Sequence, residues 1–105
     1  MTDHAPWSEA ELRALAEELM VDAWGEGEQR GAFCVAIAEH LAAPFTTHVL
    51  GVVVRVEAVE ENLGGIVALC RRGSHRQAIG ILELPLPDPP PEGAEYIEAY
   101  RLYGQ

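Results

Sequence analysis

Residues 52–82, VVVRVEAVEENLGGIVALCRRGSHRQAIGIL, decide the fold class of this chain. Valine and isoleucine dominate the stretch, and these β-branched residues favour strands. The sequence NLGG at residues 62–65 is typical of a turn, and Gly73-Ser74 predicts a second, tighter one. Together these features predict consecutive antiparallel strands joined by short hairpins.

The strand region begins at Thr46, where a valine-rich run starts after a helical segment. Gly51 interrupts this run and indicates a bulge or a sharp bend. Further strands are expected at IVALCRR from Ile66 and at RQAIGIL from Arg76. The stretch therefore predicts three or four strands.

Two helices are expected before the strands. Residues 8–23 open with Ser8 and Glu11, whose spacing is that of a capping box. In residues 28–41 apolar side chains recur at helical spacing, and Pro44 ends that helix. Glycines at 25 and 27 are expected to separate the two helices. The apolar stripes comprise Leu12, Leu15, Leu19 and Trp24 in the first helix, and Phe33, Ile37 and Leu41 in the second.

After the strands, the proline-dense residues 84–93 predict an extended connector, and residues 92–103 predict a short amphipathic helix. We expect residues 1–105 to form a single domain, with residues 1–7 as a flexible N-terminus. The predicted fold is α+β. Two N-terminal helices pack on a small antiparallel, barrel-like (SH3-like) sheet, and a short helix follows at the C-terminus.

The charge balance limits the possible partners. The 105 residues include 17 acidic and 7 basic ones, for a net charge of −10. This charge argues against nucleic acid as a partner, because neutralising phosphates needs a basic surface. No apolar run is long enough to span a membrane. The first residues lack a secretory signal pattern, so a cytoplasmic location is expected.

Half of the net charge lies in one stretch, between Glu17 and Glu28, which contains no basic residue. In a helix through residue 23, Glu18 and Asp22 would share one face. Glu26 and Glu28 would follow in a glycine turn, and Ca²⁺ takes about six to eight oxygen ligands from such groups. The acids of this stretch are Glu17, Glu18, Asp22, Glu26 and Glu28.

This acidic stretch is not an EF-hand. Counted from Asp22, the third position is Trp24 and the twelfth is Phe33, so two required oxygen ligands are missing. The alternative interpretation is a solvent-exposed, soluble helix face without a metal.

Two further charged groups lie in the strand region. Glu57, Glu60 and Glu61 precede the turn at Asn62, and Glu57 and Glu61 could face the same way; the simpler interpretation is a polar hairpin tip. Three arginines crowd the second hairpin and could bind an anion or a partner's acidic surface. The interpretation that we favour from the sequence is pairing with acids of this chain or of a neighbouring copy. The arginines are Arg71, Arg72 and Arg76.

No catalytic pattern stands out, and we do not predict an enzyme. Cys34 and Cys70 form no C-x-x-C pair, which argues against a zinc site. Both are expected to pack as small apolar residues. A thiol dyad of Cys34 with His40 or His48 is the remaining alternative.

The chain resembles the small bacterial calcium-binding proteins of the cyanobacterial CcbP type. The resemblance is carried by MVDAWGEGEQRGAF at residues 20–33 and LAAPFT at 41–46, and it covers about residues 12–103. It implies a compact α+β protein that binds Ca²⁺ through surface carboxylates, as a buffer or a sensor. The metal ligands that it implies are Asp22, Glu26 and Glu28, with Glu18 assisting.

The alternative function is a protein-interaction module that keeps this fold without a metal. Such a module would dock a basic partner on its acidic face, or an acidic partner through its arginines.

Overall fold

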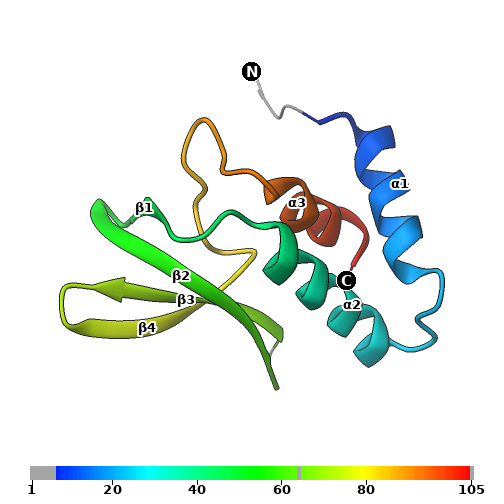
Figure 1. Ribbon diagram of the computed structural model, residues 1–105, viewed down its shortest axis with the longest axis horizontal. Helices are drawn as coiled ribbons and strands as arrows, with labels where there is room; N and C mark the ends of the chain where they lie inside the picture. The colour runs from blue at the N-terminus through cyan, green and yellow to red at the C-terminus, as the bar shows by residue number, and fades with distance from the viewer. Residues whose placement is uncertain (1–6, 64, 105) are drawn as a thin grey trace.

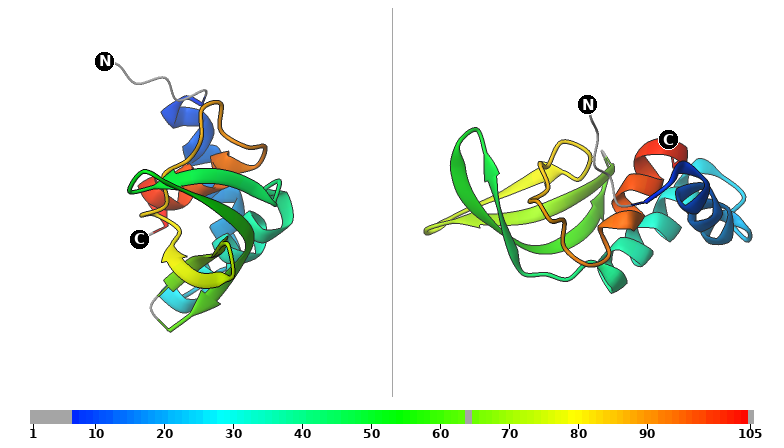
Figure 2. Two further views of the ribbon diagram at one scale, coloured as in Figure 1. Left: turned by 90° about the vertical axis from the view of Figure 1, so that its left-hand side faces the viewer. Right: turned by 90° about the horizontal axis from the view of Figure 1, so that it is seen from above.

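A computed structural model describes residues 7–63 and 65–104 of the chain (Figure 1). It contains three helices and four strands, so the predicted α+β class is confirmed. The sheet occupies one end of the molecule and the helices the other (Figures 1 and 2). In chain order the elements are α1 (Glu9–Met20), α2 (Glu26–His40), β1 (Phe45–Val49), β2 (Val52–Asn62), β3 (Gly65–Arg72), β4 (His75–Gly80) and α3 (Ala94–Tyr103).

The sheet is an antiparallel meander in the order β1-β2-β3-β4. Leu50 and Gly51 join β1 to β2 with φ values of 52° and 80°. Two consecutive positive φ values are those of a type I′ hairpin turn, so Gly51 marks a turn rather than a bulge. The bulge lies instead in β2, between Val56 and Ala58.

The predicted closure into an SH3-like barrel is not seen. In the described residues β1 and β4 are the two edges of an open sheet. Closure would require these strands to pair with each other. One face of the sheet packs against the helices and is buried, with Val56 and Ala68 on it, whereas Arg55 and Ala58 on the other face are exposed.

The core lies between the helices and the inner face of the sheet. Val56 and Ala68 face inward with no exposed surface, and the predicted stripe of α2 is buried against them. The rings of Phe33 and Tyr100 contact each other, with centroids 5.3 Å apart. The fully buried large side chains are Phe33, Ile37, Val56, Ile81 and Ile97.

The capping box of the first helix is confirmed, because Ser8 and Glu11 exchange both of its hydrogen bonds. The helix ends at Met20, however, earlier than predicted, and Trp24 is 86% exposed instead of extending the apolar stripe. The second helix begins at Glu26 with Gly25 as its N-cap. Gly27 therefore lies inside a helix and not in the turn expected there.

The proline-dense connector is tied to the rest of the fold at both ends. The Thr47 hydroxyl donates a 2.7 Å hydrogen bond to the Pro85 carbonyl, and the Glu92 carbonyl accepts one from Ala42. Trp7 packs partly buried against the core. The rest of the predicted flexible N-terminus, residues 1–6, lies outside the described residues. None of the described helices is long and apolar enough to cross a membrane.

Candidate functional site

The acidic stretch does not have the local structure that we expected. Because α1 ends at Met20, Asp22 lies in the following turn and does not share a helix face with Glu18. Glu26 and Glu28 occupy the first turn of α2. The predicted pairing of Glu18 with Asp22 on one helix face is therefore wrong, since the chain leaves the helix before Asp22.

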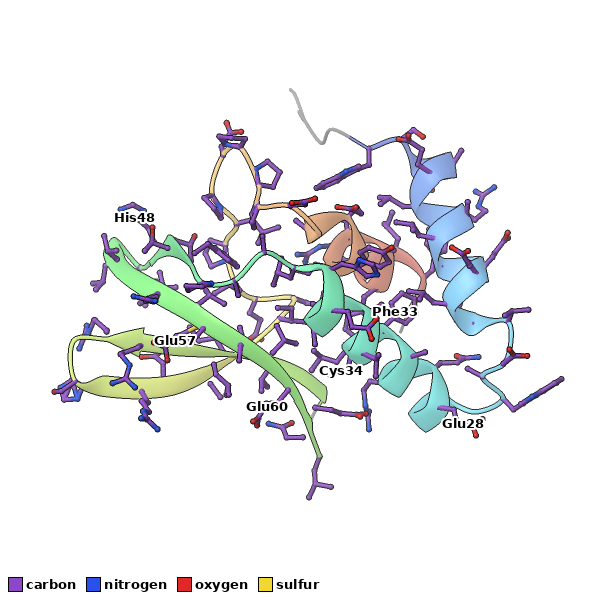
Figure 3. The ribbon with its side chains drawn as sticks, in the orientation of Figure 1. Glu28, Phe33, Cys34, His48, Glu57 and Glu60 are labelled. Atoms are coloured by element: carbon purple, nitrogen blue, oxygen red, sulfur yellow. The ribbon has the colours of Figure 1, made fainter. Side chains whose placement is uncertain are left out.

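Glu28 has a structural partner at this point. Its Oε1 accepts a 2.7 Å hydrogen bond from the backbone N–H of Trp24, just before α2 begins (Figure 3). Acids in the first turn also interact favourably with the positive end of a helix dipole. The hydrogen bond of Glu28 and the helix dipole therefore account for Glu26 and Glu28 at this helix start, and no bound ligand is required.

The predicted calcium ligands do not gather into a ready-made centre. Over residues 7–63 and 65–104, no group of three or more His, Cys, Asp or Glu side chains could hold a metal ion. Calcium binding by Glu18, Asp22, Glu26 and Glu28 therefore stays a prediction from the sequence.

The second carboxylate group is split by the β2 bulge. Without a bulge, residues four apart on one strand would point to the same face. Glu61 instead turns toward α2 and pairs with Arg30 at 3.0 Å, whereas Glu57 pairs with Arg71. Glu57 and Glu61 therefore do not share the orientation that the sequence left open, because the extra residue at the bulge reverses the alternation.

Three arginines from neighbouring strands lie side by side on the uncovered face of the sheet. Arg55 of β2 lies directly opposite Arg71 of β3, and Arg71 lies opposite Arg76 of β4. Directly opposite residues point to the same side of a sheet. We call Arg55, Arg71 and Arg76 the arginine row. Arg72 follows Arg71 and so points to the other face.

Only part of the charge of the arginine row is neutralised. Glu57 Oε2 lies 3.3 Å from the Nε of Arg71 and 3.9 Å from the Nε of Arg55. Within the described part of the chain, Arg76 forms no ion pair and is exposed. Three arginines and one glutamate leave two positive charges here, on a molecule whose net charge is −10.

A second row of side chains runs beside the arginines. Leu69 lies opposite Ala58 on one side and opposite Ala78 on the other. We call these three residues the apolar row. Because alanine is small, Leu69 lies in an open depression of about 430 Å³. The depression is lined by Glu57, Ala58, Leu69, Cys70, Arg71, Arg76, Gln77 and Ala78.

The two cysteines are not in activating surroundings. Burial raises the pKa of the Cys70 thiol, and the charge of Glu57 raises it further. Burial, followed by the charges of Glu61 and Glu60, likewise raises the pKa of Cys34. A nucleophilic thiol needs the opposite shift, toward the thiolate.

No protein-family model, curated protein or solved structure matches this chain. The resemblance to the calcium-binding family therefore remains a prediction. Sequence reasoning selected Arg71 and Arg76 but missed Arg55, which the strand register adds to them.

Proposed function

We propose that this protein is an interaction module that binds an acidic segment of a partner protein on the open face of its sheet. The observation that carries the proposal is the alignment of the arginine row beside the apolar row. Arginine is enriched at protein interfaces, and the fully buried core of an interface is more apolar than the rest of the protein surface. Arg76, which forms no ion pair among the described residues, supplies a charge that an incoming carboxylate can neutralise.

The charge distribution supports an acidic protein segment as the partner. A local positive patch on a strongly acidic molecule orients an acidic ligand, because the negative charge on the rest of the surface repels that ligand. The same repulsion opposes a long polyanion such as nucleic acid, which would have to contact the acidic surface as well. A short acidic segment can meet the arginine row alone.

The test uses two charge reversals of equal size on opposite faces of the sheet. Arg76→Glu alters the arginine row, whereas Arg72→Glu changes an exposed arginine on the other face. The probe is a fluorescein-labelled Glu-rich peptide with interspersed leucines, titrated by anisotropy. We expect Arg76→Glu to weaken binding about tenfold, which corresponds to about 1.4 kcal/mol.

The control variant, Arg72→Glu, should change the affinity by less than about twofold, because its side chain lies across the sheet from the ligand. Equal losses in the two variants would show only a general charge effect and would contradict the proposal. Absence of binding to the parent protein at low salt would contradict it as well.

Calcium binding is tested separately, because its predicted residues lie in α1, at the start of α2 and between them, at the other end of the molecule from β4 (Figure 1). A cation that binds only the native state raises the melting temperature as its concentration increases. The calcium prediction therefore requires a Ca²⁺-dependent rise that is lost in the Asp22→Asn, Glu26→Gln double variant. An unchanged melting temperature at millimolar Ca²⁺ would contradict it.

A further inference from the structure

The strand β4 is an uncovered edge of the sheet. It is the last strand in the order β1-β2-β3-β4, and among the described elements it contacts β3 alone. Residues 75–78 are all exposed. An edge strand presents unpaired backbone N–H and C=O groups, which can pair with an extended segment of another chain.

The side chains of β4 connect this edge to both rows of the open face. Arg76 and Ala78 are two residues apart, so they point to the same face about 7 Å from each other. Behind them in β3 lie Arg71 and Leu69, their partners in the register. A strand added beside β4 would therefore have one residue next to the arginine row, at Arg76, and the residue two positions away next to the apolar row, at Ala78.

The small size of Ala78 matters for this arrangement. A large side chain placed opposite Ala78 can extend over it and reach Leu69, which lies in the depression. A large side chain at position 78 would block this path. An acidic side chain two positions away on the same strand would then lie opposite Arg76 and satisfy its charge.

We propose that the partner binds as an extended strand along β4, with an acidic residue opposite Arg76 and a large apolar residue opposite Ala78. The recognised pattern is an acidic residue, any residue, and a large aliphatic or aromatic residue, in either chain direction. This inference rests on the proposed function and adds the conformation and spacing of the bound segment. Both side-chain contacts lie on the open face of the sheet, and the backbones of β4 and the added strand form hydrogen bonds with each other.

Arg76 also explains how the free edge can be selective. Charged side chains on edge strands oppose unwanted pairing between identical edges. Two copies of β4 side by side would bring like charges together, whereas an acidic strand would neutralise the charge. The same residue thus disfavours self-association and favours the proposed partner.

Two labelled peptides of identical composition test the spacing. Ser-Thr-Glu-Thr-Leu-Thr-Ser places glutamate and leucine two positions apart, and Ser-Thr-Thr-Glu-Leu-Thr-Ser places them next to each other. In an extended strand only the first peptide can direct both side chains to one face. We expect it to bind about tenfold more tightly, the effect of burying most of one leucine side chain.

Variants and modified peptides complete the test. Ala78→Leu should remove the preference for the spaced peptide, because the new side chain fills the depression. The matched control, Ala14→Leu on the exposed surface of α1, should keep it. N-methylation of alternate peptide nitrogens should abolish binding in one alternate set and spare the other, since every second N–H of an added strand faces β4.

The outcomes separate this inference from the proposed function. If both peptides bind equally and both lose affinity in Arg76→Glu, the acidic-partner function stands and strand addition is wrong. Equal effects of the two N-methylated sets would also overturn strand addition. If neither peptide nor the Glu-rich probe binds at low salt, both proposals fail together.

Discussion

Glu57 is the extra residue at the bulge of β2, and its Oε2 lies 3.3 Å from the Nε of Arg71 in the neighbouring strand β3. Both side chains are about one-third exposed, at 38% and 35%. The pair holds Arg71 on the open face and also reduces the positive charge there. It therefore competes directly with an acidic ligand.

Removing this internal competitor should strengthen binding. We expect Glu57→Gln to raise the affinity for an acidic peptide by about twofold to fivefold, the effect of one exposed ion pair. Stability should change by less than about 1 kcal/mol, because exposed pairs contribute little. Anisotropy titration and urea unfolding measure the two effects.

Glu61→Gln is the matched control for Glu57→Gln. It removes the same charge and breaks an ion pair of similar exposure, with Arg30 of α2. Because Glu61 faces the helices, its loss should leave the peptide affinity unchanged. Equal gains in the two variants would mean that only net charge matters.

Glu28 should act as a structural residue at the start of α2. Glu28→Ala removes the acceptor for the Trp24 N–H, and we expect it to lower the free energy of unfolding by about 1 kcal/mol. Glu26→Ala, which removes an acid from the same helical turn, should cost less than about 0.5 kcal/mol. Equal costs in urea unfolding would contradict the assigned role of Glu28.

Gly93 should be the glycine most sensitive to substitution among those in residues 7–63 and 65–104. Its φ is 91°, and a Cβ there would overlap the backbone carbonyl of His40 where α3 meets the end of α2. Gly93→Ala should therefore destabilise the protein by about 2 kcal/mol or more. Gly73→Ala is the control, because that glycine also has a positive φ, of 60°, but its Cβ would meet open space. A smaller loss in Gly93→Ala than in Gly73→Ala would contradict the assigned close approach.

The two thiols should be slow nucleophiles in the native protein and should make its stability pH-dependent in alkaline solution. Burial raises the pKa of Cys34 and of Cys70, so the native state holds these protons more tightly than the unfolded chain. The resulting stabilisation is complete below the ordinary thiol pKa, and it is lost as the pH rises through the raised native values.

Iodoacetamide labelling measures the first effect, and urea unfolding at increasing pH measures the second. The alkaline loss of stability should be smaller in Cys34→Ala, which removes one of the two contributions. Rapid native-state alkylation of Cys34 or Cys70, or an unchanged pH dependence in this variant, would contradict the assignment.

Much of the fold was predictable because local signals agreed with the tertiary structure. The capping box at Ser8, the apolar stripe ending at Leu41 and the β-branched strands each indicate one element, and the structure contains them. The helix boundary near Asp22 was not predictable in the same way. The N-cap of α2 is Gly25, which has no side chain to accept a capping hydrogen bond. The sequence therefore carries no capping signal for a helix that starts at Glu26 and includes Gly27.

The candidate site was less accessible to sequence reasoning than the fold. Arg71 and Arg76 were recognised as a basic group, but their alignment with Arg55 depends on strand register. The bulge after Val56 sets the orientation of Glu57 and Glu61, and its position follows from cross-strand packing. Neither feature has a local sequence signal.

The most direct test of the central claim is amide chemical-shift mapping of the protein during titration with the peptide Ser-Thr-Glu-Thr-Leu-Thr-Ser. If the open sheet face binds an acidic strand, the largest shifts will fall on β4 and the facing part of β3, at Arg76, Ala78 and Leu69. Shifts centred on α1 and the start of α2, or no shifts at low salt, would contradict the account.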